Sequence, residues 1–461
     1  MKIKTKPTAR WIETFLLVPV FIIALLGFAL LAIGMQIKLG GNPWIGLPGA
    51  LLPPLVICLS TALLHELMRR QGMQQGQLIL PVTTLIFTIG LLMIWRLQGS
   101  SGVWQQLTRG YLPGMAVMAA LIVRPRWVER IRRWAIPVSL VGLLLLLATA
   151  FIGVVDETGA RLAIQLGSLP PIQPSEIIKL SLIIFLAWYI DRQGKSAEGR
   201  AKPFLSWLRL PPIYYFLPGS LFTVLATLAL VKMADFGAVL ILAAIFVGML
   251  FVGFDTRIFL TVSAIGLLLV LLVSLVLSTV WQVPTVIRYR FLAFQNPWSN
   301  EEIVLDGRST GITISQGPGY QTQQAINAVV AGGLSGTGLG FGTPQYVPLG
   351  QSDFIFAAII EELGSIIGLA VLIFFTILLI RIARVALLLP AGQVFERLLL
   401  IGICIHFFVQ VVIMVGGTLD LLPVTGVTIP FLSQGGMALL VNLIEVGLAL
   451  SLSQRLGVQP V

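Results

Sequence analysis

The chain has 461 residues, of which 57% are hydrophobic and only 11% are charged. Its mean hydropathy is +0.96. Soluble domains carry about 25% charged residues, so this composition excludes an ordinary soluble protein and indicates an integral membrane protein. Apolar stretches long enough to cross a bilayer as helices recur along the chain, whereas the alternating strands of a membrane barrel do not.

The net charge of +11 also needs an explanation, because a basic chain can bind nucleic acid. Most of the 30 Lys and Arg residues fall in connections that alternate with the apolar stretches, on the side of the N-terminus. The positive-inside rule therefore predicts an even number of spans with both termini in the cytoplasm. The densest basic cluster, at residues 124–133, is interpreted as a topology anchor beside anionic lipid, so no nucleic-acid partner is expected.

In chain order, the apolar stretches predict an all-α, polytopic transmembrane helix bundle of about 12 spans. The predicted spans are residues 12–33, 48–66, 78–97, 110–124, 135–154, 173–190, 212–232, 234–253, 257–279, 353–380, 396–416 and 430–453. Most connections are short, but the topology places the long segment 280–352 outside. Loops longer than about 15 residues are usually functional or disordered. We expect a short surface helix in its QTQQAINAVVAGG stretch, which ends in two glycines.

Two features that often mark a ligand site carry no such signal here. The chain has only two histidines, His65 and His406, too few and too scattered for a metal cage, so both are interpreted as helix-end or packing residues. Four alternate glycines in the long loop suggest a phosphate loop, but no Lys-Ser or Lys-Thr follows them. We expect tight turns at these positions, which are Gly336, Gly338, Gly340 and Gly342.

The stretch QSDFIFAAIIEELGS places Asp353, Glu361 and Glu362 at the head of an apolar run. A charge at the bilayer centre costs at least ~2.5–3.5 kcal/mol, so such carboxylates persist where they face protein or a water-filled cavity. Asp353 begins its helix, where the helix dipole favours an anion. Glu361 lies about 12 Å deeper and about 80° round the axis, whereas Glu362 points away and needs another partner. Ion pairs that pack the helices and a role in a binding cavity both remain open.

Four motifs occur in a fixed order along the chain: IQPSEIIK, GYQTQQAINAVVAGGLSGTGLG, SDFIFAAIIEELG and LLPVTGVTIPFLSQGG. Together they resemble the SEDS family (FtsW, RodA, SpoVE), whose members polymerise peptidoglycan strands from a lipid-linked disaccharide, lipid II. The resemblance implies a ten-span core in residues 71–461, with 280–352 as its large extracytoplasmic loop. Residues 1–70 are then an N-terminal two-helix extension.

The resemblance also implies a setting for the protein. We expect a multi-pass protein of the bacterial cell membrane that acts in cell division or cell-shape maintenance. Its expected partners are lipid II, the polyprenyl-linked glycan and a transpeptidase of the class B penicillin-binding type. A divalent cation, Mg²⁺ or Mn²⁺, is a candidate cofactor. Two other functions stay open, namely a non-catalytic lipid II-binding scaffold and a flippase for the lipid-linked precursor.

Glu176 and Lys179 are three residues apart near the outer end of a predicted span, so they can pair on one helix face. Either the pair holds the shape of the bundle, or Lys179 helps to bind the substrate. Both alternatives stay open.

Further candidate binding residues lie in the outer loop. Arg288 and Arg290 sit on the side where the positive-inside rule does not favour arginine. Guanidinium groups make bidentate contacts with phosphate, so we expect these two to hold the pyrophosphate of the lipid substrate, unless they contact lipid headgroups. Tyr320 and Gln321 follow and are candidates for contacts with sugar hydroxyls.

The chain departs from the family pattern at one decisive position. The outer loop of SEDS polymerases carries a catalytic Asp, and the matching position here is Asn300, which cannot accept a proton as a carboxylate does. An inserted stretch follows, EEIVLDGRSTGITISQGP. We expect this insertion to supply the base from Glu301, Glu302 or Asp306, with impaired chemistry as the alternative.

Overall fold

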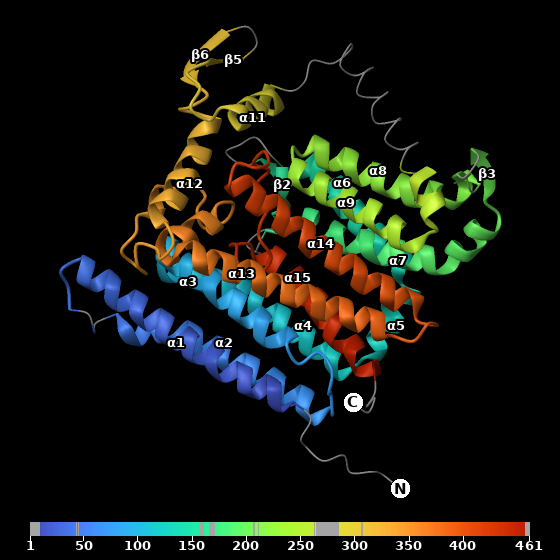
Figure 1. Cartoon of the computed structure of the whole chain (residues 1–461), viewed down its shortest axis with the longest axis horizontal. Helices are drawn as coiled ribbons and strands as arrows, with labels where there is room; N and C mark the ends of the chain where they lie inside the picture. The colour runs from blue at the N-terminus through green and yellow to red at the C-terminus, as the bar shows by residue number, and fades with distance from the viewer. Residues whose placement is uncertain are drawn as a thin grey trace.

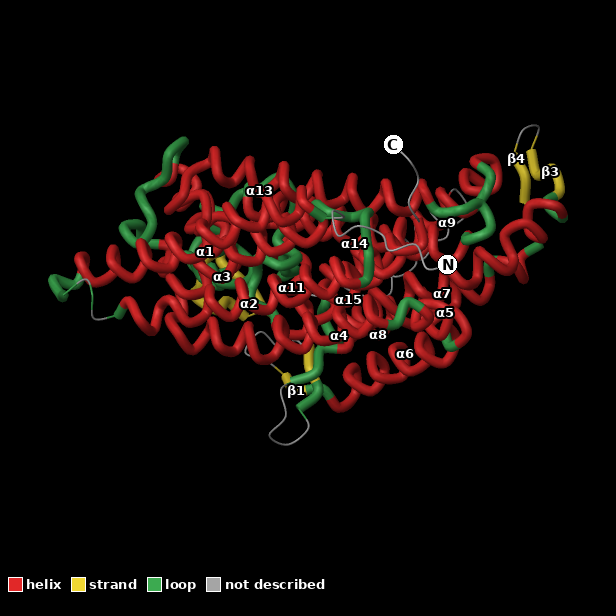
Figure 2. The backbone as a smooth tube through the Cα atoms, turned by 90° about the horizontal axis from the view of Figure 1, so that it is seen from below, coloured by secondary structure: helices red, strands yellow, loops and turns green. Residues whose placement is uncertain are grey.

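The computed structural model describes residues 10–42, 44, 46–155, 161–165, 171–205, 208–210, 212–261, 263, 285–305 and 308–456. Within these residues the protein is a bundle of helices whose only sheets are three two-stranded antiparallel hairpins. Figure 2 shows helix over almost the whole course of the chain, with only short strands between the helices. The all-α transmembrane fold expected from the composition is therefore confirmed.

The helices and strands have the following bounds. The α-helices are α1 (Trp11–Lys38), α2 (Leu47–Arg70), α3 (Ile79–Gln106), α4 (Leu112–Val123), α5 (Arg126–Arg133), α6 (Ala135–Ile152), α7 (Pro174–Gly199), α8 (Leu217–Lys232), α9 (Phe236–Gly253), α11 (Thr285–Gln295), α12 (Pro318–Gly332), α13 (Ile355–Leu388), α14 (Val394–Thr418) and α15 (Gly436–Ser453). The strands are β1 (Val154–Val155), β2 (Arg161–Ala163), β3 (Lys202–Leu205), β4 (Leu208–Leu210), β5 (Glu302–Leu305) and β6 (Arg308–Thr313).

Most predicted spans coincide with long helices, and 8 segments of the described chain are long and apolar enough to cross a membrane. In Figure 1, α1 and α2 lie along one edge of the bundle and α6 to α9 along the opposite edge, with α13, α14 and α15 between them. The predicted span 257–279 lies mostly outside the described residues. The last span was placed too early, since α15 begins at Gly436 and an irregular, proline-containing segment precedes it.

The predicted spans 78–97 and 110–124 run in opposite directions, although helical structure continues through most of the segment between them. Gly99 breaks the segment, since its φ of 66° and ψ of −158° are not helical. Near the start of the first span and the end of the second, the Gln454 amide donates to Met73 Sδ (3.1 Å) and to Ile122 O (2.9 Å). One residue therefore contacts both ends, as expected when the chain crosses and returns.

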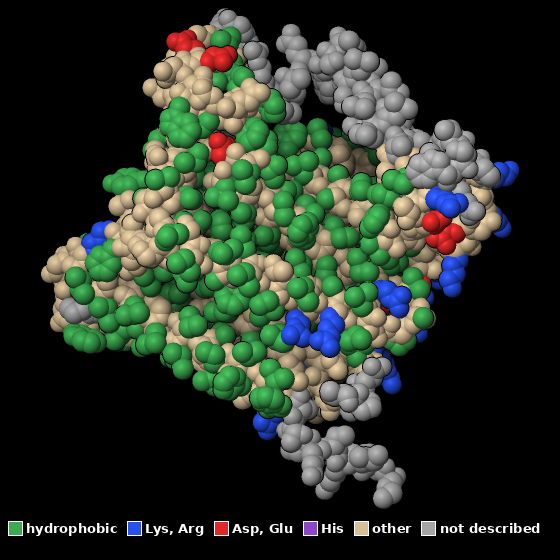
Figure 3. All heavy atoms as spheres, in the orientation of Figure 1, with side chains coloured by type: hydrophobic (Ala, Val, Ile, Leu, Met, Phe, Trp, Pro, Cys, Tyr) green, Lys and Arg blue, Asp and Glu red, His purple; other side chains and the backbone are tan. Residues whose placement is uncertain are grey.

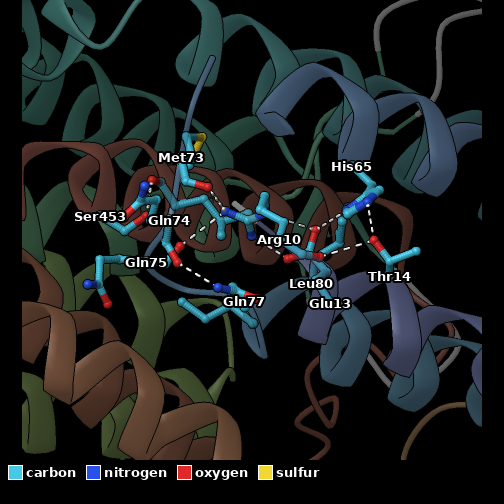
Figure 4. Close-up of polar contacts among 12 residues, drawn as sticks. Arg10, Glu13, Thr14, His65, Met73, Gln74, Gln75, Gln77, Leu80 and Ser453 are labelled. Carbon is cyan, nitrogen blue, oxygen red and sulfur yellow. Dashed lines mark hydrogen bonds and ion pairs between the residues drawn. The ribbon is translucent and has the colours of Figure 1, made fainter. Parts of the chain in front are cut away.

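The N-terminal helix pair docks on the core through a buried ionic cluster (Figure 4). Arg10 forms an ion pair with Glu13, whose carboxylate also lies 2.6 Å from His65 Nδ1 on α2. Arg10 Nη1 donates to the carbonyl oxygens of Met73 (3.4 Å) and Gln75 (3.1 Å), just before α3. His65 is thus a packing residue near a helix end, as expected.

Both ends of the described chain lie at one end of the bundle, because Arg10 and Gln454 each contact Met73. Figure 3 shows hydrophobic side chains over the middle of one face and Lys and Arg mostly toward the edge near the termini.

The long segment 280–352 contains more structure than the sequence predicted. The expected surface helix is confirmed as α12, which begins at Pro318. The segment also contains α11 and the hairpin β5–β6, which was not anticipated. Its strands are joined by the two residues 306–307, an Asp-Gly pair that favours a tight hairpin turn.

Candidate functional site

A small polar cavity of about 80 Å³ lies where α7 and α9 begin and where the segment before α15 passes over them. Its polar lining includes Ser175, Glu176, Lys179, Asp235 and Thr428. Because α7 and α9 both start here, their dipoles contribute positive potential. The cavity therefore combines one lysine, two carboxylates and hydroxyl groups with the positive ends of two helices, a lining that can bind a polar ligand.

Lys179 and Glu176 form the ion pair that their spacing predicts. Lys179 Nζ lies 2.7 Å from Glu176 Oε2, and the two side chains are 2% and 13% exposed. Both line the cavity, so the pair holds two helix turns together and also presents charge to a ligand. The geometry is compatible with both alternatives stated for Lys179.

Asp235 is a cavity residue that the sequence analysis missed. Its carboxylate caps α9 by accepting a hydrogen bond from the Ala238 N–H at 3.0 Å. Burial raises the pKa of Asp235, whereas the Ala238 hydrogen bond and the Lys179 charge favour its ionised form. The sequence does show Asp235 as a lone acid between two long apolar runs. A charge at such a position costs free energy unless it has a partner, which could have marked Asp235 as a candidate.

Asp353 and Arg290 lie at the edge of this region. Asp353 Oδ2 is 3.5 Å from the position that a Cβ on Gly426 would take, and Gly426 lines the cavity. Burial raises the pKa of Asp353 to about 6, while the Ser352 hydroxyl and the Arg290 charge oppose that shift. Asp353, just before α13, thus lies beside the cavity, and Arg290 on α11 is near enough for its charge to act on Asp353.

Glu361 and Glu362 instead hold the glycine-rich outer loop. Glu361 Oε1 accepts hydrogen bonds from Thr343 N (2.6 Å) and Thr343 Oγ1 (3.1 Å). Glu362 pairs with Arg96 Nε at 2.7 Å and accepts from Gly340 N at 2.9 Å. Arg96 is the partner that the helix geometry required for Glu362. These contacts favour the packing alternative for both carboxylates.

The same loop contains the expected tight turns. Gly336, Gly338 and Gly340 have positive φ values of 79°, 98° and 88°, a region that glycine enters without steric cost. A Cβ on Gly336 would lie 2.3 Å from the carbonyl oxygen of Glu362. The glycines are therefore required for backbone shape.

Glu301 and Glu302, two of the three candidate bases, lie apart from the cavity. Glu301 and Glu302 are exposed at the start of the β5–β6 hairpin, and Glu302 accepts a hydrogen bond from Ser309 Oγ. Figure 1 shows this hairpin at the tip of the molecule, away from β2, whose Leu162 lines the cavity. Asp306 lies outside the described residues.

Tyr320 and Gln321 are also outside the cavity lining. Tyr320 is 41% exposed and Gln321 half-buried, both in the first turn of α12. The side chain of Arg288 lies outside the described part of the structure. Among the described residues, no three His, Cys, Asp or Glu side chains are grouped as metal ligands would be.

The helix bundle and its charged cavity define a class, the multi-pass membrane proteins with a polar site at one end of their spans. More particularly, the chain belongs to the FtsW/RodA/SpoVE family, because the family model described as "Cell cycle protein" matches residues 73–457.

Two curated relatives illustrate the match. Stage V sporulation protein E of Bacillus subtilis is 31% identical over 392 residues, covering 82% of this chain and 96% of that protein. A probable peptidoglycan glycosyltransferase FtsW of Trichlorobacter lovleyi is 33% identical over 332 residues, covering 71% and 78%.

Solved structures share the fold. A chain from a peptidoglycan synthase complex that coordinates polymerization and crosslinking aligns with a TM-score of 0.62 at 24% identity, covering 82% of this chain and 97% of that chain. The rod shape determining protein RodA of Thermus thermophilus aligns with a TM-score of 0.54 at 24% identity, covering 83% and 97%.

Proposed function

We propose that this protein is a peptidoglycan glycosyltransferase that polymerises glycan strands from lipid II at the outer face of the bacterial cell membrane. The observation that carries the proposal is that the QPSEIIK motif of the family places Glu176 and Lys179 in the charged cavity. Relatives that match most of the chain are called peptidoglycan glycosyltransferases.

The proposed chemistry uses groups of this chain. Lys179 and the starts of α7 and α9 attract the pyrophosphate of the lipid-linked sugar, and Arg290, with Arg288, contacts it from α11. A carboxylate removes the proton from the 4-hydroxyl of the acceptor sugar. That oxygen then attacks the anomeric carbon of the lipid-linked glycan with inversion, and polyprenyl pyrophosphate leaves. Tyr320 and Gln321 are proposed to contact sugar hydroxyls.

The base is proposed to be Glu301, Glu302 or Asp306, and Glu301 or Glu302 can serve only if the β5–β6 hairpin comes nearer to the cavity than it lies in this structure. A general base typically contributes 10²–10⁴-fold to a rate. Purified protein with lipid II and a suitable transpeptidase should therefore make glycan polymer, and one variant among Glu301→Gln, Glu302→Gln and Asp306→Asn should lose about that much activity. If all three retain full activity, the base lies elsewhere. An inactive wild-type protein under these conditions would remove the enzymatic proposal.

A non-catalytic lipid II-binding scaffold is the second candidate, and Asn300 is the observation that favours it. Asn300 is exposed, and its Oδ1 accepts only a long contact of 3.5 Å from Ser315 Oγ among the described residues. A scaffold should bind lipid II without making polymer. A flippase should move labelled lipid across vesicles, so a scrambling assay run in parallel separates the three functions.

We infer that the partner is a class B penicillin-binding transpeptidase. The support is a structural neighbour that belongs to a complex coordinating polymerization and crosslinking. The membrane is proposed to be the bacterial inner membrane, with both termini cytoplasmic, because the basic residues gather at the end where the termini lie. Reporters fused to either terminus should both be active in the cytoplasm only.

A further inference from the structure

Two ionisable side chains that the proposed reaction does not use lie deep in the bundle. His406 is near the middle of α14 and Glu445 near the middle of α15, and both are 0% exposed. His406 Nδ1 lies 3.0 Å from Glu445 Oε1 and 3.1 Å from Oε2. An ionisable residue at this depth is expensive in a membrane, and such residues usually have a function.

A second polar layer lies one turn closer to the cavity. Gln410 follows His406 by four residues, and Asn442 precedes Glu445 by three, so each shares a helix face with one member of the pair. Since α14 leads into the segment before α15 and α15 returns, the two helices are antiparallel, which places Gln410 and Asn442 on the same side of the His406–Glu445 pair. Gln410 Nε2 donates to Thr428 Oγ1 at 3.3 Å, and Thr428 lines the cavity.

Three buried polar atoms in these two layers lack a hydrogen-bond partner among the described residues. They are His406 Nε2, Gln410 Oε1 and Asn442 Oδ1. Buried polar atoms are rarely left unpaired, and both amide side chains are at least 99% buried, with exposures of 0% and 1%. Two of the three atoms are amide oxygens, which only accept. A buried water typically makes about three hydrogen bonds to such groups.

We propose that α14 and α15 enclose a binding site for one water molecule and one proton, joined to the outer cavity through Gln410 and Thr428. The water donates its two hydrogens to Gln410 Oε1 and Asn442 Oδ1 and accepts a hydrogen bond from His406 Nε2–H. Each of the three atoms then has a partner, and the water makes three bonds.

The proton follows from the same hydrogen-bond count. The proposed water accepts a hydrogen bond from Nε2, so that nitrogen carries a hydrogen. The short contact between Nδ1 and Glu445 then requires a second hydrogen, bound either to the imidazole or to the carboxyl group. In either form the pair has no net charge, which a low-dielectric interior favours over an isolated carboxylate. A histidine protonated only on Nδ1 would instead take one water hydrogen and leave an amide oxygen unpaired.

Nitrogen NMR of the full-length protein in nanodiscs tests this directly, because the chain has only two histidines. The His406 signals are assigned by loss in His406→Asn. At neutral pH we expect His406 Nε2 to be protonated and its hydrogen to show a cross-peak to water. An unprotonated Nε2, or a protonated one without the water cross-peak, would overturn the proposal.

Variants locate the water. Gln410→Leu with Asn442→Leu removes both amide acceptors and should abolish the water cross-peak. The matched control is Ser451→Ala. Ser451 is a buried polar residue on α15 whose hydroxyl donates to Leu121 O, and its loss should leave the water cross-peak unchanged. A cross-peak that survives the double change would place the water elsewhere and contradict the site.

Stability provides a readout when a variant folds poorly. Breaking a buried pair leaves one uncompensated polar group, whereas replacing both members does not. Glu445→Leu should therefore lower the Tm more than the double change His406→Leu with Glu445→Leu. Equal losses would mean that the two side chains are not paired, which contradicts the proton site.

Discussion

Lys179 shows how this chain keeps a full charge inside an apolar bundle. The ammonium group is almost completely buried, yet Glu176 lies within ion-pair distance and Asp235 is close enough to interact electrostatically. The two neighbouring acids therefore stabilise the charge of the buried lysine, and Lys179 remains available to an anionic ligand.

Replacing Lys179 with Met should be costly for both stability and activity. Breaking a buried ion pair by removing one partner typically costs about 3–5 kcal/mol. Thermal unfolding should show the loss, and polymer synthesis from lipid II should fall with it. Lys179→Met combined with Glu176→Leu should recover stability without recovering activity.

The control is Arg70→Met, which removes an exposed pair with Glu66, since the Arg70 side chain is 78% exposed. Exposed pairs contribute about 0–1 kcal/mol, so this change should be nearly neutral. If Lys179→Met were as mild as Arg70→Met, the buried pair would have no special importance.

Asp353 should make stability depend on pH. Its pKa is about 6 in the folded protein, above the ordinary 3.8, because it is buried. The folded state therefore binds this proton more tightly than the unfolded chain, so protonation favours folding and that contribution is lost as pH rises through about 6. Asp353→Asn should make the free energy of unfolding depend less on pH between these two pKa values, 3.8 and about 6. Parallel curves for the two proteins would contradict the assignment.

At the scale of elements, the glycine-rich loop of residues 336–343 is fixed from three helices. Glu361 and Glu362 hold it from α13 and Arg96 from α3, while Lys38 at the end of α1 donates to Gly342 O at 2.9 Å. The loop therefore joins the N-terminal helix pair to the outer end of the core.

Arg96→Met should loosen this loop without unfolding the bundle. Glu362 would lose its ion pair, and its buried carboxylate would be left with the Gly340 N–H. Hydrogen exchange should become faster at Gly340 and Thr343 but stay slow in the middle of α14. Lys38→Met, which removes only a peripheral contact, should have a smaller effect. Unchanged exchange at Gly340 in Arg96→Met would mean that the ion pair does not order the loop.

At the scale of the whole molecule, the sequence predicted the elements better than the site. Apolar length alone located most helices, because a span must be long and apolar whatever it packs against. The same logic placed α15 too early and missed the β5–β6 hairpin, since hydropathy does not register a proline-containing loop or exposed strands.

The site was harder to predict because it depends on packing between distant segments. The spacing of Glu176 and Lys179 is local, and their pairing was predictable. Asp235 joins them only because α9 begins beside α7, and no sequence spacing encodes that contact. Glu361 and Glu362 are of the residue type expected in a binding site. Their partners are nevertheless Thr343 in the glycine-rich loop and Arg96 on α3, and the sequence spacing does not reveal either contact.

The most direct test is whether lipid II occupies the cavity. A photoreactive amino acid at Leu162, in the cavity lining, should cross-link to labelled lipid II, and excess unlabelled lipid II should compete. The same group at Leu144, which is 63% exposed on α6, should give no competed product. Equal cross-linking at both positions, or none at Leu162, would contradict a lipid II site in this cavity.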